Sequence, residues 1–389
     1  MILDKLPQNI LETLKICSQS ANDINLYLVG GVVRDLLLNK QTLDIDICLE
    51  ADAIEFAQIL EKKEYVNILQ TQADLKTAKV EFKNGVILDF ATTRKEKYPK
   101  ASYLPEITNF CCPLKDDITR RDFTINSLAI SLSKNNFGEV IDYLGGLEDL
   151  EKKQLKILHD KSFIDDPSRI IRALKYAVRF DFELEETTKL LLKDYLKNFN
   201  NNICYSRIMS EIEQVFEQNP QSAIEKFTEW ELNKLFNIPK INNIKFDNKE
   251  NWFLYFASLF YECNLQDCLK ISEQLNLDNN QKKIITDLIT IKENNIDKNN
   301  KIEIYNKFIN KYDNAITIYF AFTKDNTVIT FLKELKNIKT EISGDDLIKI
   351  GLTPSKEFSV ILNQLLEKKI SGENVTKEDE IDFAKKFLK

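Results

Sequence analysis

Residues 28–50, LVGGVVRDLLLNKQTLDIDICLE, contain the turn that decides the fold of the first part of this chain. The apolar run before Gly30 predicts a buried strand, the glycine pair predicts a tight turn, and the residues after Gly31 predict a helix. Backbone N–H groups at the start of a helix that follows such a turn can bind an anion. Arg34, one turn into the helix, adds a guanidinium. We therefore expect Gly30, Gly31 and Arg34 to bind a phosphate group.

The end of the same stretch alternates acidic and apolar residues. Because side chains two apart on a strand point to one side, Asp44 and Asp46 share a face while Ile45 and Ile47 enter the core. Two carboxylates at this spacing suit Mg²⁺, which binds one or two carboxylates together with substrate phosphates. An exposed strand with two aspartates is the alternative. Asp89, in the strand-like run GVILDFATT, is a candidate third carboxylate, unless it faces water on an edge strand.

The composition excludes several kinds of site. The chain of 389 residues has one histidine, His159, which excludes multi-histidine metal sites and disfavours a Ser-His-Asp hydrolase. Its seven cysteines form no CxxC pattern, so neither a disulfide framework nor a thiolate zinc site is expected. No apolar run is long enough to cross a membrane, and we expect a cytoplasmic protein. The net charge of −7 still allows a local basic groove.

Arginine and glycine are scarce and unevenly placed. All arginines lie within the first 207 residues, at positions 34, 94, 120, 121, 169, 172, 179 and 207, and no glycine occurs between 147 and 343. In a chain that uses lysine for most of its positive charge, we expect arginine at positions where a planar, forked, permanently charged group is needed. The glycine-free middle is expected to be mostly helical, and SRIIRALKYAVRF, SRIMSEIEQVFE and QKKIITDLITIKE repeat apolar residues at helical spacing.

The first 145 residues instead contain short strand-like runs separated by turns. These runs are INLYLVGG, LDIDICLE, TAKVEF, GVILDFATT and EVIDYL, and KNG between the third and fourth predicts a hairpin turn. We therefore expect an α+β protein, in which a small α/β head with a mixed sheet precedes a helical body.

Taken in order, these motifs resemble the nucleotidyltransferases that build or repair the CCA end of transfer RNA, the class shared with bacterial poly(A) polymerases. RRDFTINSLAI, at 120–130, resembles the motif of this family that selects the ribose, and the resemblance implies that Arg121, Asp122 and Asn126 hold the nucleotide. IDYLGGLEDL, at 141–150, is similar to the hinge between head and neck. The tail that begins ISGDDLIKIGLTP is similar to the element that grips transfer RNA.

DDPSRIIRALKYAVRF, at 165–180, resembles the family's base-reading helix. Asp166 and Arg169 are three apart and are expected on one helical face, with acceptors beside paired donors. Cytosine or adenine can give its amine to Asp166 and be contacted by Arg169, whereas uracil presents an oxygen to the carboxylate. Arg172 and Lys175 would face the triphosphate. Asp165 and Lys175 depart from the family's usual Glu and Arg, and an i, i+3 surface ion pair is the alternative.

The resemblance implies four parts and one reaction. The parts are a catalytic nucleotidyltransferase head (1–150), then an all-helical neck (151–225) that reads the base, body (226–335) and tail (336–389) that binds tRNA. The implied reaction is template-independent addition of C, C and A to tRNA from CTP and ATP, with Mg²⁺ held by Asp44, Asp46 and Asp89.

Other functions stay in competition. An enzyme restricted to CC or to A, or a poly(A) polymerase, would carry nearly the same motifs. A nucleotidyltransferase that acts on a small molecule would share GG and DxD but would need neither base reader nor tail. A catalytically idle RNA-binding protein would need no carboxylates.

Overall fold

The computed structural model describes residues 2–41, 44–199, 205–240, 244–246 and 251–388. The chain forms two compact units, Met1–Leu235 and Phe236–Lys389, and each is described by itself.

The first unit is built on a mixed seven-stranded sheet. Its strands, in spatial order, are β3 (Val66–Gln72), β4 (Thr77–Phe82), β5 (Ile87–Thr92), β2 (Asp46–Leu49), β1 (Leu26–Val29), β8 (Ala129–Ser131) and β9 (Val140–Ile141). Only β2 and β5 run parallel; the other neighbours are antiparallel. Two smaller sheets pair β6 (Arg94–Lys97) with β7 (Glu106–Phe110), and β10 (Gln154–Leu155) with β11 (Glu183–Leu184).

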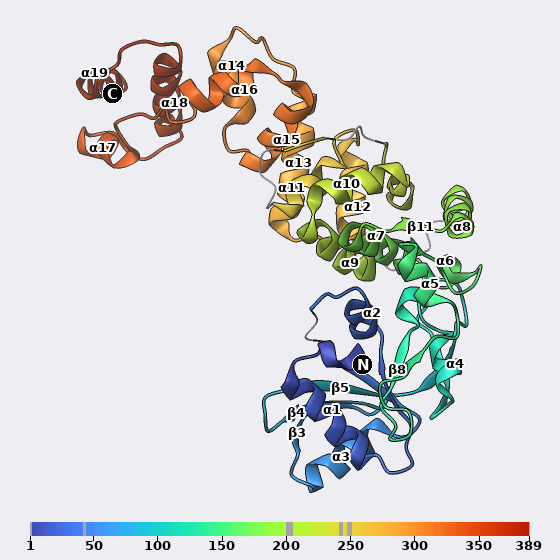
Figure 1. Ribbon diagram of the computed structural model, residues 1–389. Coiled ribbons are helices and arrows are strands. Elements are labelled where there is room, and N and C mark those ends of the chain that lie inside the picture. Colours follow the sequence, from blue (N-terminus) through green and yellow to red (C-terminus); the bar gives the residue numbers. More distant parts are fainter. Residues whose placement is uncertain (1, 42–43, 200–204, 241–243, 247–250, 389) are drawn as a thin grey trace. The chain divides into compact units, whose positions relative to one another are not determined.

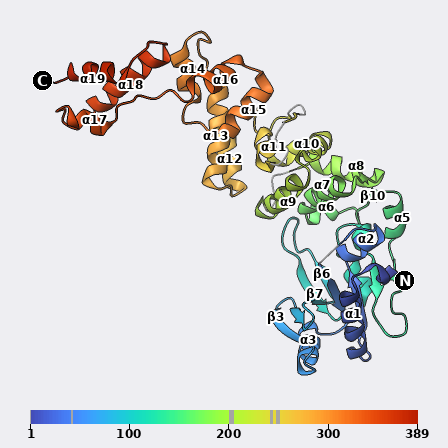
Figure 2. The ribbon, with the colours of Figure 1, turned by 60° about the vertical axis from the view of Figure 1, so that its left-hand side comes forward.

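Both faces of the sheet are covered, which explains why β2 is buried on either side. Ile45 and Ile47 are almost fully buried, as the alternation of acidic and apolar residues predicts. On the opposite face, Cys48 packs with Leu114 of α4 (Leu114–Ile118). Helix α3 (Ala53–Lys62) packs on β3, β4 and β5, where the ring of Phe56 meets the ring of Phe90 edge to face, with the ring centroids 5.3 Å apart. Helices α1 (Gln8–Ser20) and α3 lie side by side in both ribbon views (Figures 1 and 2).

Among its described residues, the first unit contains twelve helices before Leu232, some of them short and of the 3₁₀ type. They are η1 (Ile2–Lys5), α1 (Gln8–Ser20), α2 (Gly31–Leu37), α3 (Ala53–Lys62), α4 (Leu114–Ile118), η2 (Thr124–Asn126), α5 (Gly146–Glu151), α6 (Ser162–Asp165), α7 (Ser168–Phe180), α8 (Glu186–Lys197), α9 (Tyr205–Gln218) and α10 (Pro220–Glu229). A further 3₁₀ helix, η3, spans Leu232–Phe236.

Helix α7 has two chemically different faces. Ile170, Ile171 and Leu174 are fully buried, and the helix packs against α9 and α10. The arginines of α7 occupy the other side, so its strongly amphipathic sequence forms the predicted helix with an apolar face inside.

The second unit is helical throughout the part that the structure describes. Its helices are α11 (Trp252–Ser258), α12 (Leu265–Gln274), α13 (Asn279–Glu293), α14 (Lys301–Phe308), α15 (Asp313–Thr323), α16 (Asn326–Thr330), the π-helix η4 (Phe331–Leu335), α17 (Gly344–Lys349), α18 (Glu357–Ile370) and α19 (Lys377–Lys385). The last three share a small apolar core that includes Leu347, Ile361 and Leu365. There the buried Glu380 accepts the backbone N–H of Ile342 and pairs with Lys369 at 2.6 Å.

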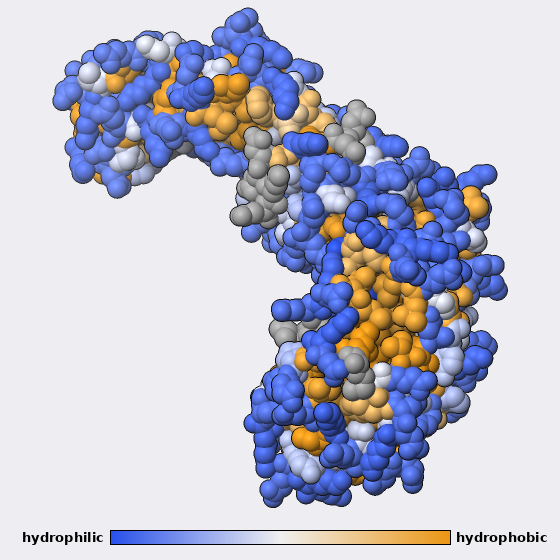
Figure 3. Space-filling view, in the orientation of Figure 1, coloured by the Kyte–Doolittle hydropathy of each residue, from blue (hydrophilic) through white to orange (hydrophobic). Residues whose placement is uncertain are grey.

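The predicted fold class, an α+β head followed by helices, is confirmed. The expectation that residues 151–225 are all helical was wrong in one detail, because β10 and β11 pair there as a short parallel ladder. The sequence did not reveal β3, β6, β7 or β8. No helix among the described residues is long and apolar enough to span a bilayer. Hydrophilic residues cover most of the face in Figure 3, and apolar ones gather over the first unit between α2 and α5.

Candidate active site

Three carboxylates meet where two parallel strands run side by side. Asp46 is the first residue of β2, and its register partner on β5 is Asp89. Asp44 lies two residues earlier. The three side chains offer oxygens that all lie within 4.8 Å of one another, which suits a divalent cation that prefers hard oxygen ligands. The three residues predicted as metal ligands are therefore together in space.

The cluster carries unbalanced negative charge. Burial, together with the neighbouring carboxylates of Asp44 and Asp89, raises the pKa of Asp46 to about 6 against the opposing effects of Arg121 and Lys79. A bound divalent cation would relieve this repulsion. Lys79 is the nearest protein cation: it stands opposite Asp89 in the β4–β5 ladder, and its Nζ lies 3.0 Å from an Asp89 oxygen.

The glycine pair has a steric reason at its first position. Gly30 has φ +74° and ψ −137°, which side-chain-bearing residues rarely adopt. A Cβ there would lie 3.4 Å from Nη1 of Arg121 and 3.9 Å from an Asp46 oxygen. Glycine thus allows the backbone to approach both groups. Gly31 starts α2 with no such backbone requirement, and a Cβ there would meet only the end of the Arg34 side chain.

Arg34 is buried and already heavily engaged. Its Nε and Nη2 bind Asp35 at 2.8 and 2.7 Å, and its Nη1 donates to Oδ1 of Asn126 at 2.6 Å. The rings of Tyr176 and Phe180 lie 5.0 and 4.6 Å from its guanidinium carbon. The predicted phosphate contact of Arg34 stays a prediction, while its visible contacts connect the glycine turn to Asn126.

The guanidinium of Arg121 is paired at one nitrogen and has no partner among the described residues at another. Its Nη2 pairs at 2.9 Å with the buried Asp117, which also binds Arg120. Burial opposes ionisation of Asp117, but Arg121 and Arg120 outweigh it and hold its pKa below the usual value. No residue that the structure describes accepts a hydrogen bond from the buried Nε of Arg121. A ligand beside Gly30 would instead meet Nη1 of Arg121, which lies 3.4 Å from the position that a Cβ would take at Gly30.

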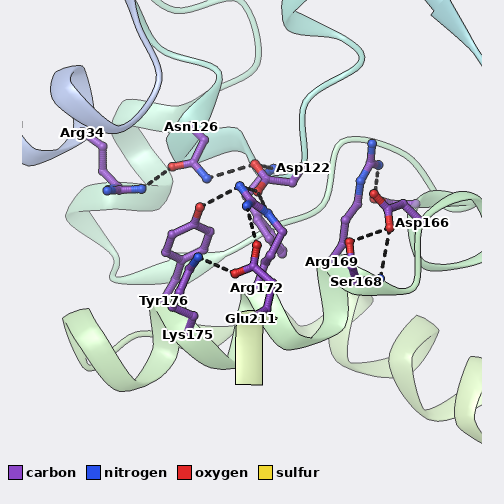
Figure 4. A network of polar contacts seen from close by, with 12 residues as sticks. Arg34, Asp122, Asn126, Asp166, Ser168, Arg169, Arg172, Lys175, Tyr176 and Glu211 are labelled. Atoms are coloured by element: carbon purple, nitrogen blue, oxygen red, sulfur yellow. Dashed lines mark hydrogen bonds and ion pairs between the residues drawn. The ribbon is translucent and has the colours of Figure 1, made fainter. Parts of the chain in front are cut away.

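A polar network connects the ribose motif to α7 and α9 (Figure 4). One oxygen of Asp122 accepts from Asn126 Nδ2 at 2.9 Å, and the other accepts from Nε of Arg172 at 2.8 Å. Burial opposes ionisation of Asp122, but Arg172 and the hydrogen bond from Asn126 hold its pKa below the usual value. Nη1 of Arg172 also forms an ion pair with Oε1 of Glu211 at 3.1 Å, and Glu211 pairs in addition with Lys175.

The sequence-based geometry of the base-reading pair was wrong in one respect. Asp166 is not on the helix: it is extended (φ −139°, ψ 94°), and α7 begins at Ser168. The cause is Pro167, because the residue before a proline is disfavoured in helical conformation. No ion pair joins Asp166 to Arg169 among the described contacts; Asp166 pairs with Arg207 at 2.9 Å instead.

Arg169 is fixed by neighbours from three segments. Its Nη1 donates to Ser162 Oγ at 2.7 Å, and its Nη2 donates to the Arg120 carbonyl at 2.9 Å and to the hydroxyl of Tyr98 at 3.3 Å. Only 3% of Arg169 is exposed. The carboxylate of Asp165 lies 4.0 Å from His159 and is not among the recorded partners of Arg169.

All thirteen residues predicted from the sequence border one cavity of about 1160 Å³ in the first unit. They are Gly30, Gly31, Arg34, Asp44, Asp46, Asp89, Arg121, Asp122, Asn126, Asp166, Arg169, Arg172 and Lys175. Sequence reasoning missed Lys79, Tyr98, Arg207 and Glu211, which border the same cavity. The hairpin turn at KNG could have revealed Lys79, because a ladder centred on Asn84 places it opposite Asp89.

Comparison with known proteins agrees with this geometry. Residues 26–156 match the family described as the poly(A) polymerase head domain. An A-adding tRNA nucleotidyltransferase of Geobacter sulfurreducens is 28% identical over 97% of this chain, which spans only 47% of that relative's length. The A-adding enzyme of Halalkalibacterium halodurans is 27% identical over 98% of this chain and 94% of its own, and a CCA-adding enzyme of Ligilactobacillus salivarius is 28% identical over 100% and 99%.

Solved structures of similar proteins cover the same length. A CCA-adding enzyme in an apo form aligns with a TM-score of 0.78 at 27% identity, over 100% of this chain and 98% of the other. Complexes of a CCA-adding enzyme with CTP and with ATP align with TM-scores of 0.76 and 0.75, at 26% and 27% identity, over 98% of this chain and 96% and 94% of theirs.

Proposed function

This chain belongs to the family of nucleotidyltransferases that contains the CCA-adding enzymes, and we propose that it adds C, C and A to the 3′ end of transfer RNA from CTP and ATP, releasing pyrophosphate. One observation carries the proposal: the three carboxylates of the cluster, the side chains of Arg121 and Arg172, and the two residues Asp166 and Arg169 all border a single cavity. Chemistry and choice of base can therefore take place on one bound nucleotide. The proposed location is the cytoplasm.

We assign the metal site to Asp44, Asp46 and Asp89, and we propose Mg²⁺ as the ion. Mg²⁺ bound there would supply Lewis-acid stabilisation of the phosphoryl oxygens. The protein side chains do the rest by position and charge. Gly30 brings the backbone close to Nη1 of Arg121, a guanidinium donor that suits a phosphate oxygen.

On the nucleoside side, we propose that Asp122 and Asn126 contact the ribose and that Asp166 and Arg169 read the base. Asp166 is 8% exposed and Arg169 3%, so a contact with the base replaces little water and is strengthened by the low local dielectric. An ionised carboxylate accepts the amine of cytosine or adenine and repels the uracil oxygen. Contacts of this quality discriminate by about 1–3 kcal/mol each.

Arg172 and Lys175 are proposed to serve the triphosphate. Both pair with Glu211, which holds them at the edge of the same cavity. The four-part division into head, neck, body and tail, with 336–389 gripping transfer RNA, remains part of this proposal.

A second candidate is addition of A alone. It is favoured by the A-adding relative of Halalkalibacterium halodurans, which this chain matches over nearly its whole length. The same cavity would serve that reaction, because adenine also presents an amine to Asp166.

The deciding experiment supplies three transfer RNA transcripts, which end before the first C, after one C and after both. Each is incubated with Mg²⁺ and with CTP, ATP, UTP or GTP singly, or with CTP and ATP together. Ordered addition of C, C and A that then stops supports the proposal. Extension of the CC-ended transcript alone identifies an A-adding enzyme, and no extension of any transcript refutes both.

Asp46→Asn is the matched control for the chemistry. We expect it to abolish incorporation while transfer RNA binding, measured by filter retention, stays within about twofold, because backbone contacts dominate nucleic-acid affinity. Loss of binding to the same degree as loss of incorporation would contradict the metal-ligand role.

A further inference from the structure

Helix α9 carries two charged side chains, one helical turn apart, toward the base-reading segment. Arg207 lies beside Asp166, with Nη2 at 2.9 Å from Oδ2, and Glu211 pairs with Arg172 and Lys175. The charges are complementary in both places. The cationic Arg207 faces the carboxylate of Asp166, and the anionic Glu211 faces the cations Arg172 and Lys175. Helix α9 thus supports residues at both ends of the nucleotide site.

Both oxygens of the Asp166 carboxylate accept hydrogen bonds from the protein. Its Oδ1 accepts the backbone N–H of Ser168 at 3.1 Å and the Ser168 hydroxyl at 2.6 Å, while Oδ2 accepts from Arg207 (Figure 4 shows the Ser168 contacts). A carboxylate offers about four lone-pair positions, and these three contacts leave one, on Oδ2. The remaining acceptor position is therefore fixed in direction as well as in charge.

We propose that Arg207 is a specificity-determining positioning residue: it holds the Asp166 carboxylate oriented so that Oδ2 accepts an amine from cytosine or adenine and rejects the uracil oxygen. This inference rests on the proposed function. Without Arg207 the carboxylate can rotate about its Cα–Cβ and Cβ–Cγ bonds. The acceptor position on Oδ2 then loses its fixed direction, which weakens the discrimination between an amine and the uracil oxygen.

Glu211 provides the internal contrast. Its partners, Arg172 and Lys175, face the part of the nucleotide that is common to all four triphosphates. Loss of Glu211 should therefore change the affinity for every nucleotide alike, whereas loss of Arg207 should change the choice among them. Glu213, on the same helix, is exposed and does not border the cavity.

The test compares Arg207→Gln, Arg207→Lys, Ser168→Ala, Glu211→Gln and the control Glu213→Gln in the full chain. The first readout is kcat/KM for CTP and for UTP on a transcript that lacks CCA. The second, without RNA, is the Kd for CTP and for UTP by calorimetry. Thermal melting checks the fold of each variant, and because Arg207 has a side chain that is 39% exposed, we expect it to be replaceable without unfolding.

We expect Arg207→Gln to reduce the CTP-over-UTP ratio by about tenfold, within what one side chain–base contact discriminates. Arg207→Lys should restore part of the ratio, since it keeps the charge but loses the fork. Ser168→Ala should lower the ratio from the other side of the carboxylate, and it decides the question if Arg207→Gln fails to fold. Glu211→Gln should raise KM for both nucleotides and leave the ratio unchanged.

An unchanged ratio in folded Arg207→Gln or in Ser168→Ala, with equal losses for CTP and UTP, overturns the positioning role. Failure of the proposed function has a different signature, because the wild-type protein would then extend no transcript or only the transcript that ends in CC. In that case the RNA-free binding ratio still reports on Arg207.

Discussion

Replacing Gly30 by alanine would test whether the glycine turn is needed for backbone geometry. Its φ of +74° with ψ −137° costs a side-chain-bearing residue on the order of 1–3 kcal/mol. Alanine also lowers the entropy of the unfolded chain, which stabilises by about 0.4–1 kcal/mol. The difference predicts that Gly30→Ala destabilises the first unit by about 1–2 kcal/mol.

The same substitution should impair catalysis more than it impairs stability. The new Cβ would lie 3.4 Å from Nη1 of Arg121 and 3.9 Å from an Asp46 oxygen, so relief of strain in the turn moves groups that we propose contact the nucleotide and the metal. Since small displacements of reacting groups cost large factors in rate, we expect kcat/KM to fall about tenfold or more.

Gly31→Ala is the matched control, one residue along the chain. Gly31 has an ordinary helical backbone, and its added Cβ would meet only Nη2 of Arg34 at 3.4 Å, the end of a side chain. Alanine is the better helix former, so this variant should be neutral or more stable by up to about 1 kcal/mol. The two substitutions are thus expected to have opposite signs.

Urea unfolding of the full chain can measure both effects if one tryptophan reports on the first unit. The chain has two tryptophans, and Trp252→Phe leaves Trp230, which is buried in the unit that ends at Leu235. In this background the fluorescence midpoint follows that unit. Equal shifts for Gly30→Ala and Gly31→Ala, or a stabilised Gly30→Ala, would refute the reasoning.

Two further predictions concern charges around the site. Asp117→Asn leaves Arg120 and Arg121 without their shared buried partner and should cost about 3 kcal/mol near neutral pH. Because the folded pKa of Asp117 is lowered, this difference from wild type should shrink as pH falls below about 4, and a constant difference from pH 7 to pH 3 would contradict it. Lys79→Met removes the cation that pairs with Asp89; since both side chains are partly exposed, Mn²⁺ binding measured by electron paramagnetic resonance should tighten only about two- to fivefold, and weaker binding would count against competition between Lys79 and the metal.

Local patterns predicted five of the strands and the helices α2, α7, α9 and α13, and every residue that they assigned to the site borders the cavity. The alternation around Asp44 and Asp46 predicted β2 and its buried face, and the apolar repeat of SRIIRALKYAVRF predicted α7 from end to end. The extended backbone of Asp166 could have been read from Pro167, which follows it.

Local patterns could not predict which segments, distant in sequence, contact one another. Arg207 and Glu211 meet residues some forty positions earlier, because α9 packs on α7, and periodicity alone does not say which helices pack. The pairing of β2 with β5 is likewise non-local, since α3 and two strands intervene. The neighbours of Arg34 were missed for the same reason.

The parallel pairing of β2 with β5 places the whole carboxylate cluster inside the head domain, apart in sequence from the residues that we propose read the base. The matched head domain ends at residue 156 and includes every carboxylate of the cluster, whereas Asp166, Arg169 and the α9 residues lie beyond it. Mutations that retune the neck can therefore accumulate without touching the metal ligands. A lineage could in this way exchange one nucleotide preference for another while its reaction stays the same.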